Sequence, residues 1–259
     1  MSLVETDWLE KNLNNVRILD CSWHMPQTKR NGFEEYKQHH ISKAIFFDLD
    51  DNSNKNTSLP HMLVEKSDWE KIVGKMGIKK NDKIVIYDNS DVVSSCRCWF
   101  NFIYFGHDPK LIYVLNGGLN KWIKEKREVT KDLPIIKQSH YECFEIKELV
   151  KNKIFIDENI NDQKFKVIDA RSKERFEGKI PEPRENLRSG NIKKSLCIPF
   201  NLCLNEDKTF KKKEDLKNIF KTRLENIEEK NIVFSCGSGV TACVLALAYS
   251  LINDKYHPC

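Results

Sequence analysis

The sequence predicts an α/β protein built from two similar domains. Short apolar runs alternate with helical patterns along the chain, and the same order of segments occurs twice. The chain has 259 residues, of which 40% are hydrophobic and 31% charged, with 10 Gly and 8 Pro. This length has room for one large domain or two of about 130 residues. The low Gly and Pro content and the ample aromatic content exclude collagen, coiled coil and general disorder.

Matching segments carry the repeat. Asp20 ends the apolar run VRILD, and Asp169 ends the run FKVID; downstream, HHISKAIFFDL resembles GNIKKSLCIPF. Further on, DKIVIYD ends at Asp88 and EKNIVFSC ends at Cys236. The offsets agree, with 68 residues from Asp20 to Asp88 and 67 from Asp169 to Cys236. Two copies of one unit explain this agreement better than chance.

Helical patterns lie between the predicted strands. Ser67 and Glu70 form a capping box that predicts a helix start, and Gly77 can close that helix. The segment 211–224 has apolar residues on one helical face, at Leu216, Ile219, Phe220 and Leu224. Strands that alternate with such helices predict, in each domain, a mainly parallel sheet flanked by helices.

The repeat divides the chain into two domains, 1–138 and 139–259, joined by the polar, Pro-containing link 130–145. The copies differ at the end of the last shared strand, where the first has Asp88 and the second Cys236. We therefore expect a non-catalytic first domain and a catalytic second domain.

The second copy is predicted to be incomplete. In the first copy, Gly117 follows Asp88 by 29 residues, after the strand LIYVLN; the same offset from Cys236 lies beyond residue 259. The loss of a final strand would leave ladder groups unpaired and apolar surface uncovered. We expect reduced stability and weak activity from a C-terminally truncated second domain.

Charge and apolar patterning narrow the class of protein. Up to residue 138 there are 21 Lys and Arg against 19 Asp and Glu, and after it 22 against 19. This even spread argues against nucleic-acid binding. No apolar run approaches the roughly 18 residues needed to span a membrane. The acidic start MSLVETDWLEKNL is unlike a signal peptide, so we expect a cytoplasmic protein.

The nine cysteines argue against disulfides and metal. Their number is odd in a chain predicted to be cytoplasmic, no CxxC pair occurs, and Cys96 and Cys98 have no matching His pair. We expect no metal site. Most cysteines are then predicted to be buried as small apolar residues, with one left to react.

The segment 232–252 predicts a strand, a tight loop and a helix, with Cys236 opening the loop. Gly237 and Gly239 flank Ser238 and let the backbone turn its N–H groups inward. A cysteine at a helix N-terminus is stabilised as the thiolate, its reactive form. The alternative is a structural cysteine in a turn, like Cys243 inside the following helix.

Two other motifs compete for this loop. Residues 237–242 satisfy the dinucleotide fingerprint GxGxxA, but that fingerprint needs a second strand with an acidic residue about 20 positions on. The sequence stops before such a strand. A phosphatase loop would need an Arg six positions after the cysteine, where Ala242 stands, so phosphate-ester chemistry is not expected.

The loop CGSGVTAC resembles the active loop of the 3-mercaptopyruvate sulfurtransferases, a branch of the rhodanese family. The segment DARSKERFEGKIPEPRENLRSGNIKKSLCIPF resembles the second-domain signature of that family, and LNGGLNKW and AIFFDLD resemble first-domain signatures. The likeness covers nearly the whole chain. It implies two tandem rhodanese-like domains, the first of them inactive.

The resemblance implies that Cys236 takes the sulfur of 3-mercaptopyruvate as a persulfide, releases pyruvate and passes the sulfur to an acceptor. The acceptor could be thioredoxin, a small thiol or cyanide, and no cofactor is implied. Backbone N–H groups from Gly237 to Thr241, including those of Gly239 and Val240, would bind the departing enolate.

Arg175 and Arg184 match the substrate-binding segment of the family, and a guanidinium can grip a carboxylate with two hydrogen bonds. The alternative is that both form surface ion pairs with Glu177, Glu182 or Glu185.

Asp50 and His61 match a first-domain pair that, with Ser238, is implied to relay protons. The alternative for His61 is a solvated histidine in a polar loop.

The residues leave three functions open. The neutral Gly237 and Ser238 favour 3-mercaptopyruvate over the thiosulfate dianion. A thiosulfate:cyanide sulfurtransferase and a catalytically inactive rhodanese-like binding module are the alternatives. Neither nucleic acid nor a membrane is expected as a partner.

Overall fold

A computed structural model describes residues 2–184, 187–229 and 231–258. The chain divides into two compact units. Unit 1 comprises residues 1–146 and 206–209, and unit 2 comprises residues 147–205 and 210–259. Each unit is described by itself. Residues 139–146 pack with unit 1, through bonds such as the one from Ser139 N to Gly74 O; the division at 138 remains our interpretation of the repeat.

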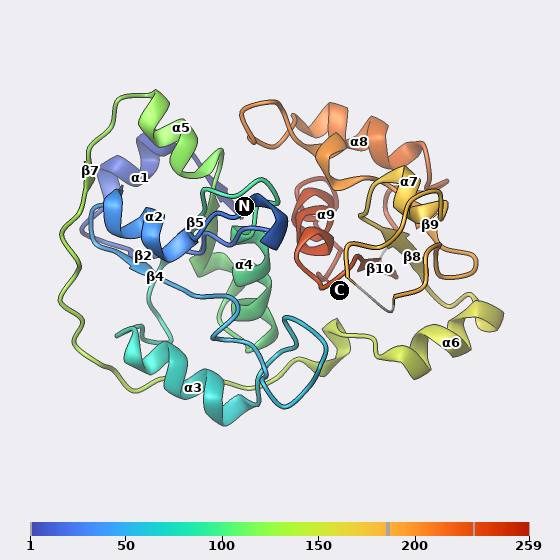
Figure 1. Cartoon of the computed structure of the whole chain (residues 1–259), viewed down its shortest axis with the longest axis horizontal. Coiled ribbons are helices and arrows are strands. Elements are labelled where there is room, and N and C mark those ends of the chain that lie inside the picture. The colour runs from blue at the N-terminus through green and yellow to red at the C-terminus, as the bar shows by residue number, and fades with distance from the viewer. Residues whose placement is uncertain (1, 185–186, 230, 259) are drawn as a thin grey trace. The chain divides into compact units, whose positions relative to one another are not determined.

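Unit 1 contains a five-stranded parallel sheet with the strand order β1-β6-β5-β2-β4 (Figure 1). Its strands are β1 (Leu3–Val4), β2 (Arg17–Asp20), β4 (Ala44–Phe46), β5 (Ile84–Tyr87) and β6 (Ile112–Leu115). A separate antiparallel pair joins β3 (His40–Ile41) to β7 (Val129–Thr130). Asp20 lies beside both Phe46 and Tyr87, so the carboxyl ends of β2, β4 and β5 meet at one edge.

Five α-helices and two short 3-10 helices connect these strands. They are α1 (Thr6–Asn12), η1 (Pro26–Thr28), α2 (Gly32–Gln38), α3 (Lys66–Lys75), α4 (Ser95–Tyr104), η2 (Pro109–Leu111) and α5 (Gly118–Lys124). In Figure 1, α1, α2 and α5 gather on one side of the sheet, with α3 and α4 on the other. Strand residues alternate between these two sides, and Val85 and Tyr87 belong to the same core cluster as Leu9 and Trp122.

Aromatic packing stabilises the α3 and α4 side of unit 1. The Trp69 ring is fully buried, stacks on Phe105 at a centroid distance of 4.7 Å and meets the Phe102 ring edge-on at 5.1 Å. Truncation of such a residue costs about 3–5 kcal/mol, because the cavity left behind collapses only in part. This packing fixes α4, and with it the loop that α4 follows.

The predicted capping box at the start of α3 is wrong. The N-cap is Glu65, two residues before Ser67, and no side chain caps this end of the helix. The chain approaches the helix extended at Glu65, so Ser67 lies inside the first turn. The predicted end is confirmed: Gly77 follows the C-cap Met76 with a φ of +68°, which glycine adopts without strain.

Unit 2 contains a three-stranded parallel sheet with the order β10-β8-β9. The strands are β8 (Lys166–Asp169), β9 (Leu196–Cys197) and β10 (Ile232–Ser235). The helices are η3 (Lys147–Leu149), α6 (Lys153–Asp162), α7 (Lys173–Phe176), η4 (Phe200–Cys203), α8 (Lys213–Lys221) and α9 (Thr241–Ser250). In α8, Leu216 and Phe220 are fully buried, as the apolar spacing predicts.

The two sheets confirm the predicted α/β class with mainly parallel strands, and they differ in extent. After α9, the described residues 251–258 form turns, and the described part of unit 2 contains no strand that corresponds to β6. Tyr256 packs instead against Phe234 and Tyr249 at centroid distances of 5.8 and 5.0 Å. None of the helices in the described residues is long and apolar enough to cross a membrane.

Candidate active site

The loop of residues 236–240 joins β10 to α9 at the carboxyl edge of the second sheet. Gly239 adopts a φ of +77°, a backbone conformation that favours glycine, and its N–H donates a hydrogen bond to the Cys236 sulfur at 3.1 Å. The ten-residue helix α9 begins directly afterwards at Thr241. The sulfur therefore accepts a backbone hydrogen bond in the loop that leads into the N-terminus of α9.

Burial distinguishes Cys236 from the other described cysteines. Seven of these eight side chains are buried, and Cys236 alone is partly exposed. Burial raises the pKa of the Cys143 and Cys197 thiols to about 11, and that of Cys203 to about 12. Cys243 is 5% exposed and donates to Gly239 O, as expected for a structural cysteine. Cys236 is thus the described cysteine that a substrate can reach.

Two arginines from another part of unit 2 lie against this loop. A Cβ atom built on Gly237 would lie 3.2 Å from Nη2 of Arg175 and 3.5 Å from Nη2 of Arg184. Arg184 also donates a hydrogen bond to the carbonyl oxygen of Gly237. The structure therefore brings two guanidinium groups to the residue that follows the cysteine. The glycine leaves them room to approach the backbone.

Buried charges of alternating sign connect the sheet to Arg175. Arg171 grips Asp169 through Nε–Oδ1 (3.0 Å) and Nη2–Oδ2 (2.6 Å), and its Nη1 donates to Glu182 at 2.7 Å. Glu182 in turn accepts from Arg175 Nη2 at 2.5 Å. Asp169 ends β8, so this chain of charges, in the order Asp169, Arg171, Glu182 and Arg175, runs from the sheet to the loop.

Glu182 is ionised between the two guanidinium groups. Burial alone would raise its pKa, but the hydrogen bond and charge of Arg175 and the charge of Arg171 bring the pKa below its usual value. The alternative prediction, that Arg175 forms an ion pair with a nearby glutamate, is confirmed for Glu182. The prediction that this ion pair lies on the surface is wrong, since the Glu182 side chain is only 4% exposed. Glu177 pairs with Lys173 and Lys179 instead, and Glu185 lies outside the described residues.

In unit 1, the structure brings Asp50 and His61 together. His61 Nε2 lies 2.9 Å from Asp50 Oδ1, and the indole N–H of Trp23 donates to Asp50 Oδ2 at 2.9 Å. The Trp23 ring meets the His61 ring edge-on at a centroid distance of 4.8 Å. The hydrogen bond from His61 lowers the pKa of Asp50, although partial burial opposes this effect.

The predicted alternative of a solvated His61 is wrong. The residue is 5% exposed, and Arg97, itself buried in α4, donates to its carbonyl oxygen at 2.5 Å. Its φ of +57° is uncommon for a residue with a side chain, and such strain is frequent at functional sites. Ser238 lies in unit 2. The described Asp50–His61 contact lies within unit 1, and the relay to Ser238 remains a prediction.

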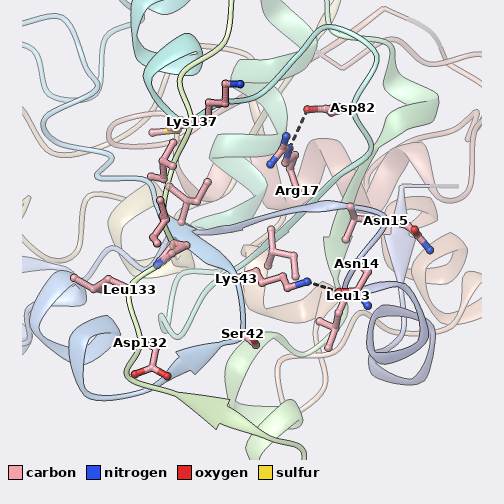
Figure 2. Close-up of a pocket in the computed structure, with 18 of the residues that line it drawn as sticks. Leu13, Asn14, Asn15, Arg17, Ser42, Lys43, Asp82, Asp132, Leu133 and Lys137 are labelled. Atoms are coloured by element: carbon pink, nitrogen blue, oxygen red, sulfur yellow. Dashed lines mark hydrogen bonds and ion pairs between the residues drawn. The ribbon is translucent and has the colours of Figure 1, made fainter.

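Two cavities of unit 1 lie at opposite ends of its strands. A cavity of about 120 Å³ at the carboxyl ends is lined by residues that include Trp23, His24 and Asp50. A larger one, of about 730 Å³, lies at the amino ends beneath the link and is lined by residues that include Arg17, Lys43 and Lys137 (Figure 2). The larger cavity is lined by neither cysteine nor histidine. Of the proposed relay residues, Asp50 therefore lines the smaller cavity.

In residues 2–184, 187–229 and 231–258, no group of three or more His, Cys, Asp or Glu side chains is placed to hold a metal ion.

Sequence reasoning missed the charges and rings behind the predicted site residues. The sequence predicts no role for Arg171 or Trp23, and it predicts Glu182 only as a surface partner of the arginines. Arg171 stands two residues after Asp169, at the end of a buried strand, which was a usable signal. Glu182 comes from an irregular segment, and no periodicity could have marked it.

Comparisons with known proteins agree with this architecture. The model of the rhodanese-like domain matches residues 5–125 and 155–257. A thiosulfate/3-mercaptopyruvate sulfurtransferase of Arabidopsis thaliana, named as mitochondrial, is 39% identical over 95% of this chain and 70% of its own length. A 3-mercaptopyruvate sulfurtransferase of Mus musculus is 32% identical over 99% of this chain and 88% of its own.

A solved structure extends the likeness to three dimensions. The crystal structure of SseA from Escherichia coli, a 3-mercaptopyruvate sulfotransferase with the rhodanese fold, matches with a TM-score of 0.87 and 27% identity. The match covers 97% of this chain and 95% of that one.

Two parallel α/β units with a cysteine loop in the second define a tandem rhodanese-like protein. The chain belongs to the rhodanese family, and it is an enzyme of the sulfurtransferase class.

Proposed function

We propose that this enzyme transfers sulfur from 3-mercaptopyruvate through a persulfide on Cys236 and releases pyruvate. The observation that carries the proposal is the combination of a partly exposed cysteine, a backbone N–H 3.1 Å from its sulfur and two guanidinium groups against the next residue. A nucleophile, an anion-stabilising loop and cations for a carboxylate are the groups that this reaction needs.

The first step forms a sulfur–sulfur bond and breaks a carbon–sulfur bond. The Cys236 thiolate attacks the thiol sulfur of 3-mercaptopyruvate, and the electron pair of the broken bond moves to carbon 3. The products are Cys–S–SH and the enolate of pyruvate, which becomes pyruvate when it takes up a proton. In the second step an acceptor thiolate attacks the outer sulfur, and the Cys236 thiolate is regenerated.

Backbone N–H groups and guanidinium groups bind different parts of the substrate in this proposal. The N–H groups of residues 237–241 stabilise the enolate oxygen as its negative charge develops. Arg184 and Arg175 bind the carboxylate, which a planar guanidinium can hold with two parallel hydrogen bonds. Both lie within reach of Gly237, one residue from the nucleophile.

The charge of the loop surroundings favours a donor with one negative charge. Arg171, Arg175 and Arg184 contribute three positive charges, and Asp169 and Glu182 offset two of them. One net positive charge suits a single carboxylate better than the thiosulfate dianion. The neutral residues Gly237 and Ser238 also favour a donor with one negative charge.

Asp50, His61 and Ser238 are proposed to supply the proton that the enolate takes up. An imidazole can both donate and accept a proton, and the contact between His61 Nε2 and Asp50 Oδ1 orients the ring. Thioredoxin, a small thiol or cyanide is proposed as the sulfur acceptor. The cytoplasm is the proposed compartment, whereas the Arabidopsis relative is named as mitochondrial.

Intact-mass spectrometry after treatment with each donor tests this function. We expect 3-mercaptopyruvate to add about 32 Da, one sulfur atom, and peptide mapping to locate it on Cys236. An adduct from thiosulfate alone would support the thiosulfate:cyanide sulfurtransferase. No adduct from either donor would leave the inactive binding module as the better account.

A further inference from the structure

Glu182 occupies an unusual position in unit 2. Its carboxylate accepts hydrogen bonds from two arginines, with Oε1 2.7 Å from Arg171 Nη1 and Oε2 2.5 Å from Arg175 Nη2. Its side chain is 4% exposed, whereas those of Arg171 and Arg175 are 11% and 20% exposed. A buried carboxylate with two cationic partners orients both of them through charge-assisted hydrogen bonds.

The support behind Glu182 begins in the sheet. Arg171 is held by both carboxylate oxygens of Asp169, and its Nη2 also donates to Gly190 O at 2.7 Å. Arg171 is therefore fixed from both sides and presents Nη1 to Glu182. On the other side of Glu182, the Arg175 guanidinium has no other side-chain partner among the described residues than this carboxylate.

We propose that Glu182 is a positioning residue that aims the Arg175 guanidinium at the Cys236 loop and thereby sets the affinity for the carboxylate of the donor. The inference rests on the proposed function and adds to it the group that orders the substrate-binding arginine. Without Glu182, Arg175 would lose its anchor and sample several rotamers, and binding would then have to order it. The loss falls on donor binding and leaves the nucleophile in place.

The sequence offers a matched control. Glu177 lies five residues before Glu182, and it pairs with the exposed lysines Lys173 (3.7 Å) and Lys179 (2.6 Å). The replacement Glu177→Gln removes the same charge from the same segment without touching Arg175. Glu182→Gln keeps the shape of the side chain and removes the charge that faces the two arginines.

Steady-state kinetics with 3-mercaptopyruvate test the proposal, with the fraction of active enzyme determined from the persulfide mass gain. We expect Glu182→Gln to raise KM by about tenfold or more, the cost of a lost charged hydrogen bond, with kcat per active site changed by less than about twofold. Glu177→Gln is expected to match the unsubstituted enzyme in both constants.

The outcomes separate positioning from a merely structural role. If Glu182→Gln reduces the active fraction while the remaining enzyme keeps its KM, the proposal is overturned. If this variant does not fold, Glu182→Asp keeps the charge but shortens the reach, and it is expected to raise KM severalfold; an unchanged KM would overturn the proposal as well. Failure of the unsubstituted enzyme to gain sulfur from either donor would refute the proposed function instead.

Discussion

The loops that follow β5 and β10 are built on the same plan and differ in the group at their centre. Each joins the carboxyl end of a parallel strand to a ten-residue helix, α4 in unit 1 and α9 in unit 2. In unit 1 the residue after the strand is Asp88, and in unit 2 it is Cys236. Backbone N–H groups donate to that residue in both loops, from Ser90 and Ser95 at Asp88 and from Gly239 at Cys236.

The two loops differ in the group that accepts these hydrogen bonds and in its exposure. Asp88 accepts from the N–H groups of Ser90 (2.8 Å) and Ser95 (3.0 Å), and it is 6% exposed. Burial raises the pKa of Asp88 above its usual value. The loop of unit 1 is thus closed on its own carboxylate, whereas the glycines of unit 2 leave a sulfur that is partly exposed. The same strand, loop and helix thus hold a buried carboxylate in one unit and a partly exposed sulfur in the other.

A second contrast involves the aspartates that end β2 and β8. Asp169 is paired with Arg171 and begins the chain of charges that reaches Arg175. Asp20 is also buried, but it accepts from the N–H of Ser22 and has no arginine partner among the described residues. Desolvation by burial raises the pKa of Asp20 to about 6. The buried charge of Asp169 is therefore paired with an arginine, whereas ionisation of the buried Asp20 destabilises the folded chain.

The largest expected effect comes from exchanging the central group of each loop. Cys236→Ser should abolish the persulfide and lower kcat/KM on the order of 10³-fold or more, because the hydroxyl cannot accept sulfur at this oxidation level. Asp88→Asn should leave kcat/KM within about threefold, since the proposed mechanism gives its loop no role in the chemistry. Sulfur-transfer assays of both variants check this; comparable losses in the two would contradict the assigned division of labour.

A smaller effect is expected at His61 of unit 1. His61→Asn should lower kcat by about 10²-fold, the usual contribution of a general acid or base, because the enolate then takes its proton from water. Pyruvate release at saturating 3-mercaptopyruvate measures it. His140→Asn is the matched control, since His140 is 83% exposed and pairs only with Glu142 among described residues. Equal rates for both variants would remove His61 from the mechanism.

Stability should depend on pH through Asp20. The folded chain holds the Asp20 proton up to about pH 6, whereas the usual pKa of this group is 3.8, so stability is lost as pH rises between these values. The loss amounts to about 3 kcal/mol, from about 1.4 kcal/mol for each unit of pKa. Asp20→Asn cannot titrate, and it should therefore be more stable than the unsubstituted chain at pH 7 but not at pH 4.

Urea unfolding at the two pH values measures this difference. Asp169→Asn provides a comparison of opposite sign, because it removes one of the two carboxylates that pair with the buried Arg171 and should destabilise the chain at pH 7. If Asp20→Asn and the unsubstituted chain lose stability in parallel between pH 4 and pH 7, the assignment to Asp20 fails.

The smallest effect is expected from Gly237→Ala. The added methyl group would meet the ends of Arg175 and Arg184 at 3.2 and 3.5 Å, and flexible side-chain ends can yield by a few tenths of an ångström. We expect KM for 3-mercaptopyruvate to rise by no more than about fivefold, with little change in stability. Initial-rate kinetics decide this. A loss as large as that of Cys236→Ser would show that the loop tolerates no side chain at residue 237.

The fold class and the residues of the loop that contains Cys236 could be predicted from the sequence. The repeat of strand ends at Asp20, Asp88, Asp169 and Cys236 depends on local apolar runs, and local patterns survive folding. The loop was predictable for the same reason, since its glycines and its helix are neighbours in the chain.

The partners of these residues could not be predicted in the same way. The burial of His61 depends on Arg97 and Trp23, which lie 36 and 38 positions away, and an isolated polar segment gave the opposite expectation. The pairing of Glu182 with Arg171 depends on how an irregular segment folds back on β8. The false capping box at Ser67 shows that even a local motif fails when the preceding chain sets the helix start.

A competition between two donors tests the central claim most directly. The enzyme is mixed with equimolar 3-mercaptopyruvate and thiosulfate whose outer sulfur is ³⁴S, and the peptide that contains Cys236 is weighed after a single turnover. We predict a gain of about 32 Da, because the loop surroundings suit a single carboxylate. A gain of about 34 Da, or sulfur on another cysteine, would contradict the account.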